Sequence, residues 1–240
     1  MNKMIKILII IIMMTFLGGC REDREDMPIS VETKTNDPEK KTFLALGDSY
    51  TIGESVDLNE RWPAQLVDSL NARDFNVARP HIIAVTGWTT NDLLNGINRE
   101  KPQGPFDLVS LLIGVNNQYR GNSVESYRPD FQQLLQQAIA LAGGDPRHVF
   151  VLSIPDWGVT PFAAYRDSQK IAQEIDAYNA ANRDETLAAG AFYVDITGIS
   201  RQAKTEPGLI AGDGLHPSGE MYREWVKVLL PVVEKILAKH

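Results

Sequence analysis

The 240-residue sequence contains a single cysteine, Cys20, so no disulfide can form within the chain. Acidic residues outnumber basic ones by 31 to 24, and no run of five or more basic residues occurs, which argues against nucleic acid as a partner. Metal-binding spacings such as His-Glu-x-x-His, paired cysteines and glycine-rich phosphate loops are also missing. The sequence therefore predicts a protein that works without a metal or another cofactor.

The first nineteen residues differ from the rest of the chain. Two lysines precede an apolar stretch from Ile7 to Leu17, which is too short for a comfortable membrane span but suits a secretion signal. The ending Leu17-Gly18-Gly19-Cys20 resembles the lipobox of bacterial lipoproteins, which implies cleavage before Cys20 and lipidation of that cysteine. The alternatives are an uncleaved anchor helix and a chance cysteine. We expect a signal peptide over residues 1–19 and a lipid anchor in the bacterial cell envelope, facing the periplasm or the cell surface.

The segment after the cysteine is predicted to be a tether. Residues 20–41 are charged, poor in aromatic side chains and interrupted by Pro28 and Pro38, as is typical of flexible segments. From Thr42 onward no internal repeat and no second change of composition is found. The chain is 43% hydrophobic, and a segment of this length can bury one sizeable core. We expect one domain over residues 42–240.

Within this domain, short apolar runs alternate with longer segments whose apolar residues recur at helical spacing. The expected strands are Phe43–Leu46, Ile82–Val85, Asp107–Ile113, His148–Ile154 and Phe192–Ile196. The expected helices are Glu60–Arg73, Thr90–Arg99, Pro129–Ala142, Ser168–Ala189 and Ser218–Lys239, the last kinked or restarted at Pro231. Interleaved strands and helices predict a five-stranded parallel sheet with helices on both faces, an α/β fold.

Polar residues suited to chemistry follow the ends of the expected strands. Gly47-Asp48-Ser49 follows the first strand, Gly87 lies after the second, and Gly114–Asn117 follows the third. Asp213 and His216 precede the last helix. Ligands of such sheets bind beyond the carboxyl ends of the strands, so these residues predict a single site at that edge.

The residue types at this edge suit acyl transfer. The Ser49 hydroxyl needs a base to become a nucleophile, and the imidazole of His216 suits that role near neutral pH. An acid such as Asp213 would orient the imidazole, although a spacing of three residues does not guarantee the contact. Candidate donors for a developing oxyanion are the backbone N–H groups of Ser49 and Gly87 and the side-chain amide of Asn116. We expect glycine at position 87 because a side chain there would obstruct a close backbone approach.

Four short blocks, in this order, resemble those of the SGNH/GDSL hydrolases: Gly47-Asp48-Ser49, Gly87, Gly114-x-Asn116 and Asp213-x-x-His216. The resemblance covers the chain from residue 42 to its end. It implies a flavodoxin-like three-layer α/β/α fold and hydrolysis of esters or thioesters through an acyl-serine intermediate. It implies Ser49 as nucleophile, His216 as base and Asp213 as orienting acid, and oxyanion donation by Ser49, Gly87 and Asn116.

The third block departs from the family pattern, which usually reads Gly-x-Asn-Asp, because Asn117 replaces the acid. We interpret this change as the loss of a supporting charge, with an effect on the geometry around the site rather than on activity. The G-x-S-x-G elbow of the α/β-hydrolases is absent, since Thr51 stands where its second glycine would be.

Other titratable residues are weaker candidates for the base and for the acid that orients it. His81 and His148 sit at strand starts, on the opposite edge of the sheet, and His240 ends the chain. Asp92 suits the first turn of its helix, where a carboxylate interacts favourably with the helix dipole. Asp195 ends a strand and is an alternative orienting acid, with a structural role preferred.

The substrate is specified only coarsely. Aromatic side chains that could line the site are Tyr50, Trp62, Trp88, Tyr119, Trp157 and Phe162, with a core role preferred for Trp62. We expect a carboxylester hydrolase acting on short acyl esters, with O-acetylated carbohydrates ahead of lysophospholipids or thioesters. The alternative is a catalytically inactive lipoprotein that binds glycans, and Asn117 is the one feature of the sequence that favours it. The sequence does not indicate an oligomeric state.

Overall fold

The computed structural model describes residues 40–238, which belong to one compact unit. The expected signal peptide, Cys20 and nearly all of the tether lie outside the described residues. Among residues 40–238, no helix combines the length and apolar composition that a membrane span requires.

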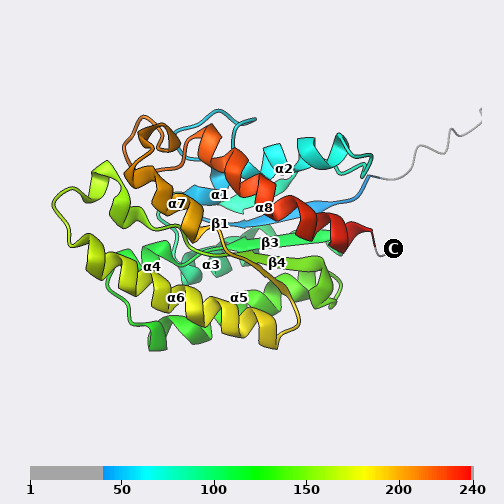
Figure 1. Cartoon of the computed structure of the whole chain (residues 1–240). Coiled ribbons are helices and arrows are strands. Elements are labelled where there is room, and N and C mark those ends of the chain that lie inside the picture. The colour runs from blue at the N-terminus through cyan, green and yellow to red at the C-terminus, as the bar shows by residue number, and fades with distance from the viewer. Residues whose placement is uncertain (1–39, 239–240) are drawn as a thin grey trace, which may run out of the picture. The chain divides into compact units, whose positions relative to one another are not determined.

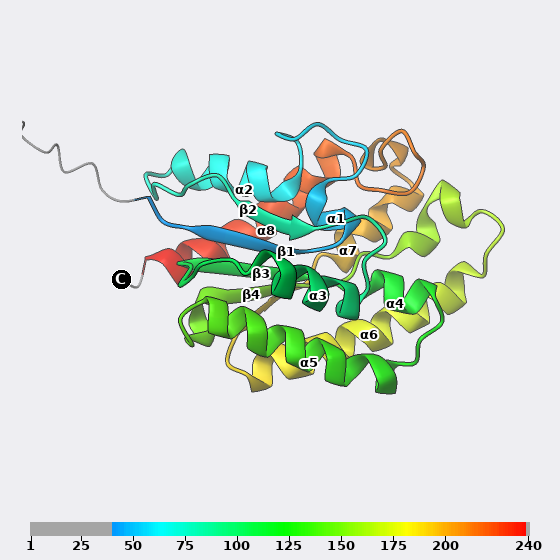
Figure 2. The same cartoon turned by 180° about the vertical axis from the view of Figure 1, so that it is seen from behind.

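The core of the domain is a five-stranded sheet in which every pairing is parallel. Its strands are β1 (Phe43–Gly47), β2 (His81–Ala84), β3 (Leu108–Leu112), β4 (Val149–Leu152) and β5 (Phe192–Val194). The spatial order is β2-β1-β3-β4-β5, so the direction in which strands are added to the sheet reverses between β1 and β3. Figure 2 shows β2, β1, β3 and β4 in this order. The predicted α/β fold is confirmed. The reversal creates a crevice beyond β1 and β3, where ligands of such sheets bind.

Helices cover both faces of the sheet, and Figures 1 and 2 show α2 and α8 on one face and α3, α5 and α6 on the other. The longer helices are α2 (Trp62–Asn71), α3 (Thr90–Glu100), α5 (Val124–Leu141), α6 (Ser168–Ala188) and α8 (Gly219–Leu237). Three short helices, α1 (Ser49–Ile52), α4 (Val115–Tyr119) and α7 (Thr197–Arg201), follow β1, β3 and β5. Because both faces are covered, β1, β3 and β4 are buried at every residue.

Two helices differ from the expectation based on proline. Helix α5 begins at Val124, not at Pro129, because the Ser123 hydroxyl caps an earlier turn by accepting the N–H of Ser126. Pro129 therefore lies inside the helix. Helix α8 likewise continues through Pro231 without restarting, and its apolar face is buried from Met221 onward. In both cases capping and packing outweigh the local preference of proline.

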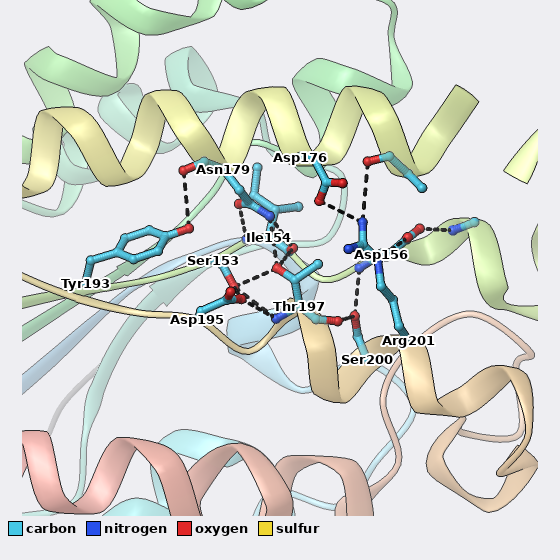
Figure 3. A network of polar contacts seen from close by, with 12 residues as sticks. Ser153, Ile154, Asp156, Asp176, Asn179, Tyr193, Asp195, Thr197, Ser200 and Arg201 are labelled. Carbon is cyan, nitrogen blue, oxygen red and sulfur yellow. Dashed lines mark hydrogen bonds and ion pairs between the residues drawn. The ribbon is translucent and has the colours of Figure 1, made fainter. Parts of the chain in front are cut away.

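A polar network joins the end of β4 to α6 and α7 (Figure 3). The Ser153 hydroxyl donates to Asp195 and accepts the backbone N–H of Ile196 and Thr197. On α6, the Asn179 amide binds both the N–H and the carbonyl of Ile154. Asp195 is thus committed to holding this junction, in agreement with the preferred structural role.

Candidate active site

The turn after β1 explains why the strand ends at Gly47-Asp48-Ser49. A Cβ on Gly47 would lie only 2.6 Å from the Leu112 carbonyl oxygen of neighbouring β3, so only glycine fits there. Asp48 then caps α1, accepting the N–H of Tyr50 at 3.1 Å. Ser49 is the first residue of α1, where a backbone N–H has no partner within the helix. The turn therefore holds the Ser49 hydroxyl and N–H at the carboxyl edge of the sheet.

The loop before α8 brings Asp213 and His216 together. His216 Nδ1 lies 2.5 Å from Asp213 Oδ2, and the other carboxylate oxygen accepts the N–H groups of Leu215 and His216 at 2.9 and 3.0 Å. The turn requires a left-handed residue, which Gly214 provides with a φ of +74°. An ionised carboxylate only accepts, so Nδ1 carries a proton, and in the neutral tautomer that this bond selects the lone pair lies on Nε2.

The carboxyl group of Asp213 is held in its ionised form. Partial burial favours the protonated form, but hydrogen bonds from the His216 ring, from two backbone N–H groups and from the Ser55 hydroxyl outweigh it. The pKa of Asp213 therefore lies well below its ordinary value. A permanent negative charge beside Nδ1 would stabilise an imidazolium.

Ser49 and His216 line one pocket of about 160 Å³ at this edge. The other lining residues are Tyr50, Thr86, Gly87, Val115, Asn116, Tyr119, Trp157, Phe162 and Leu215. No hydrogen bond between the Ser49 hydroxyl and the His216 ring occurs among the described residues. Such bonds are often long in free enzymes and tighten when substrate is present. Thr86, Val115 and Leu215 also line the pocket and were not predicted to do so, because their residue types carry no signal and only their place beside Gly87, Asn116 and His216 in the chain could have indicated it.

Three candidate donors lie at the pocket. The backbone N–H groups of Ser49 and Gly87 have no hydrogen-bond partner among residues 40–238. Asn116 donates one N–H to the Trp88 carbonyl at 2.9 Å, which leaves its second N–H available. The reason for glycine at position 87 is corrected. A Cβ there would meet no protein atom within 4 Å, whereas its φ of +84° favours glycine.

The loop that carries Gly87 is fastened to α4. In addition to the Asn116 bond, the Arg120 guanidinium donates to the Gly87 carbonyl at 2.7 Å. The Asn117 amide accepts the Thr90 N–H at 3.1 Å and donates to the Thr90 hydroxyl at 2.8 Å. Asn117 is buried, and its neutral amide satisfies both polar groups of Thr90. The interpretation that the missing charge affects the geometry around the site stays a hypothesis.

The aromatic candidates divide into three groups. Tyr50, Tyr119, Trp157 and Phe162 line the pocket, and the last three form a cluster with ring centroids 5.4–6.1 Å apart. Trp62 is completely buried, which confirms the core role preferred for it. Trp88 is not a lining residue, because its ring packs against Gly96 of α3, where the missing side chain makes room for it.

The competing titratable residues have other partners. Asp92 forms a capping box with Thr89 at the start of α3. His81 lies at the amino end of β2, 3.5 Å from Glu100, and the His148 ring contacts the Asp107 carbonyl at 2.7 Å. Within residues 40–238, no cluster of three or more His, Cys, Asp or Glu side chains could hold a metal ion.

Similar folds occur among solved structures. TesA aligns with a TM-score of 0.65 and 18% identity, covering 82% of this chain and 99% of its own. The esterase EstA from Pseudoalteromonas sp. aligns with a TM-score of 0.63 and 17% identity, covering 83% and 100%. Axe2, an acetylxylan esterase from Geobacillus stearothermophilus, aligns with a TM-score of 0.60 and 17% identity, covering 83% and 95%. These likenesses show the fold.

The family follows from the sequence. No curated protein sequence matches the chain. The sequence profile of the GDSL-like lipase/acylhydrolase family, however, matches residues 45–224, which span the turn at Ser49, the Gly87 loop, α4 and the Asp213–His216 loop. The chain therefore belongs to the GDSL-like lipase/acylhydrolase family and is an ester-hydrolysing enzyme.

Proposed function

We propose that this enzyme hydrolyses short-chain carboxylic esters through an acyl-Ser49 intermediate, with O-acetylated carbohydrates as its natural substrates. The observation that carries the proposal is the shared pocket, which is lined by Ser49 and by the His216 ring, whose Nδ1 lies 2.5 Å from Asp213 Oδ2. An ester carbonyl in this pocket would lie within reach of a hydroxyl, a base and three N–H donors.

In the first half of the reaction, His216 Nε2 takes the Ser49 proton while the oxygen attacks the ester carbonyl. The negative charge that develops on the carbonyl oxygen is stabilised by the N–H groups of Ser49 and Gly87 and by the Asn116 amide. The imidazolium, stabilised by ionised Asp213, then gives its proton to the departing alcohol. The C–O bond of the ester breaks, and the acyl group remains on Ser49.

In the second half, water replaces the alcohol. His216 takes a proton from the water, whose oxygen attacks the acyl carbon, and the same donors hold the second oxyanion. The proton returns to the Ser49 oxygen as the carboxylic acid leaves. Enzyme and base are restored, and no cofactor enters either half.

The dimensions of the pocket favour a small acyl group. A cavity of about 150 Å³ can hold a benzene-sized molecule, and this pocket has about 160 Å³. An acetyl group fits readily, and a long acyl chain would have to extend beyond it. Axe2, which shares the fold, is an acetylxylan esterase, and its substrate class supports an acetylated carbohydrate here.

The first experiment measures hydrolysis of p-nitrophenyl esters from acetate to long-chain acyl groups by the enzyme and its Ser49→Ala variant. We expect Ser49-dependent turnover that is fastest with acetate. Preference for long chains would point instead to lipid or thioester substrates. Absence of Ser49-dependent turnover at every chain length would overturn the hydrolytic mechanism and favour the glycan-binding alternative.

We also propose that Cys20 is lipidated after removal of residues 1–19 and that it anchors the enzyme in the bacterial envelope, with the domain in the periplasm or at the cell surface. The support is the lipobox-like ending around the only cysteine of the chain. Labelled palmitate fed to producing cells should enter the protein, and Cys20→Ala should abolish both the label and membrane association. Unchanged membrane association of the variant would overturn the anchor.

A further inference from the structure

Two further hollows adjoin the pocket that contains Ser49. The nearer one, of about 330 Å³, shares Tyr119 and Trp157 with that pocket. The farther one, of about 340 Å³, shares Gln118, Gly121 and Glu174 with the nearer one. We call the two together the distal groove. Its lining residues are Gln118, Tyr119, Gly121, Asn122, Ser123, Val124, Trp157, Arg166, Asp167, Lys170, Ile171, Gln173, Glu174, Ala177 and Tyr178.

The shared residues place the pocket and the distal groove side by side. Tyr119 stands between them with 47% of its surface exposed, so a ligand that occupied both would lie against its ring. The indole N–H of Trp157 donates to Gln118 at 2.8 Å, and the Gln118 amide donates to Glu174 of α6 at 2.6 Å. A line of contacts thus leads from the pocket wall to the helix that forms the far side of the groove.

The wall on α6 is firmly held. Asp176 binds Arg201 at 2.7 Å, and Arg201 also binds buried Asp156 at 2.9 Å (Figure 3). Asn179, on the next turn of α6, is tied to the backbone beyond β4. Figure 3 shows Asp176 and Asn179 directed toward this network. Gln173 and Ala177, on the same helix, line the groove. The groove is therefore formed in advance, which lowers the entropic cost of binding an extended ligand.

The chemistry of the lining suits a neutral, polyhydroxylated ligand. Arg166 and Lys170 are balanced by Asp167 and Glu174, so the groove offers no net charge to an ionic polymer. Amide side chains such as Gln173 both donate and accept, as sugar hydroxyls do. Neither Gln173 nor Asn122 uses its side-chain amide in a hydrogen bond with another described residue. Apolar surface is also present, at Val124, Ala177 and Tyr178 of the farther hollow, and it can pack against the carbon faces of sugar rings.

We infer that the distal groove binds further sugar units of a neutral oligosaccharide whose acetyl ester lies at Ser49. The enzyme would then prefer acetylated glycan chains to single acetylated sugars. This inference rests on the proposed function, because it extends the substrate from that site along Tyr119 and α6. The Tyr119 ring supplies an aromatic surface for a sugar at the crossing point.

The test compares kcat/KM for acetylated oligomers of increasing length, from the monomer upward, in ladders built on xylose, glucose and N-acetylglucosamine. Ala177→Trp fills the groove from an exposed helix position. Ala188→Trp is the matched control, because Ala188 is exposed on the same helix about 16 Å farther along and lines neither hollow. Hydrolysis of p-nitrophenyl acetate is the control reaction, because this substrate has no further sugar units to contact the groove.

We expect kcat/KM of the enzyme to rise with length on at least one ladder, by about tenfold, which corresponds to one good aromatic contact with its neighbouring hydrogen bonds. Ala177→Trp should flatten that rise and leave p-nitrophenyl acetate unchanged, and Ala188→Trp should behave like the unaltered enzyme. If the enzyme hydrolyses p-nitrophenyl acetate through Ser49 but kcat/KM does not rise with length on any ladder, the groove inference is overturned and the proposed function is not. Equal effects of the two tryptophan variants would overturn the groove inference as well. If the unaltered enzyme showed no Ser49-dependent hydrolysis of p-nitrophenyl acetate, the proposed function itself would be refuted.

Discussion

The hydroxyl of Ser55 donates a 2.8 Å hydrogen bond to Oδ2 of Asp213, the same oxygen that contacts the His216 ring. Ser55 follows α1 in the chain and holds a left-handed backbone, with a φ of 67°. The loop next to the Ser49 turn thus fixes the carboxylate that orients the imidazole. Ser55 is a positioning residue, since it acts on the proposed reaction through Asp213.

Ser55→Ala should lower kcat by about tenfold, because a hydrogen bond to a charged group is lost and Asp213 gains freedom to turn away from His216. KM for p-nitrophenyl acetate should change little. Ser55→Gly is the matched variant, since it also lacks the hydroxyl but adopts a positive φ without strain. Equal losses of kcat identify the hydroxyl as the cause. A loss confined to Ser55→Ala would assign the effect to backbone conformation.

Asp213→Asn should reduce kcat by a factor on the order of 10³ to 10⁴, because the amide can donate to Nδ1 and favours the wrong imidazole tautomer. The amide oxygen can still accept the Leu215 and His216 N–H groups, so the loop should keep its conformation. Steady-state kinetics and thermal unfolding of the variant test both parts. Unimpaired turnover would remove Asp213 from the mechanism and indicate a Ser49–His216 dyad.

Asn116→Ala should lower kcat by about 10² to 10³ while KM stays nearly constant, because the lost N–H acts on charge that appears only in the transition state. The variant also loses the bond to the Trp88 carbonyl. Arg120→Gln separates the two effects, because Arg120 holds the same loop through the Gly87 carbonyl but does not line the pocket. A loss of kcat in Arg120→Gln as large as that in Asn116→Ala would assign the effect to loop placement.

Asp48 should make the enzyme less stable as the pH rises. Burial raises its pKa from 3.8 to about 7, against the hydrogen bond from the Tyr50 N–H, and its Oδ2 has no partner among the described residues. The unfolded chain loses this proton first, so the contribution of Asp48 to the free energy of unfolding is complete below about pH 4 and is lost as the pH rises to about 7.

Asp48→Asn should remove this part of the pH dependence, as measured by urea unfolding between about pH 3 and pH 8, a range that spans the two pKa values. The amide that replaces the carboxyl group can still cap α1 through its oxygen. Asp92→Asn is an informative comparison. The pKa of Asp92 is lowered, chiefly by the Thr89 N–H, so its contribution is lost in the opposite direction, as the pH falls. An unchanged pH slope in Asp48→Asn would show that Asp48 is ionised in the folded enzyme.

The sequence alone determined the strand–helix alternation and the edge at which polar residues gather. Apolar runs such as Phe43–Leu46 and the helical spacing of apolar residues in α8 are local patterns, and they persist in the folded chain because they decide which face can be buried. The turns at Gly47-Asp48-Ser49 and Asp213-x-x-His216 could also be predicted from the sequence, because turn and capping preferences depend on only a few neighbouring residues.

Only the tertiary structure decided which distant residues meet. Ser55 lies 158 residues from Asp213, and neither its spacing nor its residue type indicates the contact. Trp88 turned toward Gly96, and Asn117 found both of its partners on Thr90, because packing and hydrogen-bond satisfaction are settled by neighbours from other elements. The distal groove is likewise formed by α4, α6 and the loops between them, and a concave surface is a property of the assembled fold that no single segment carries.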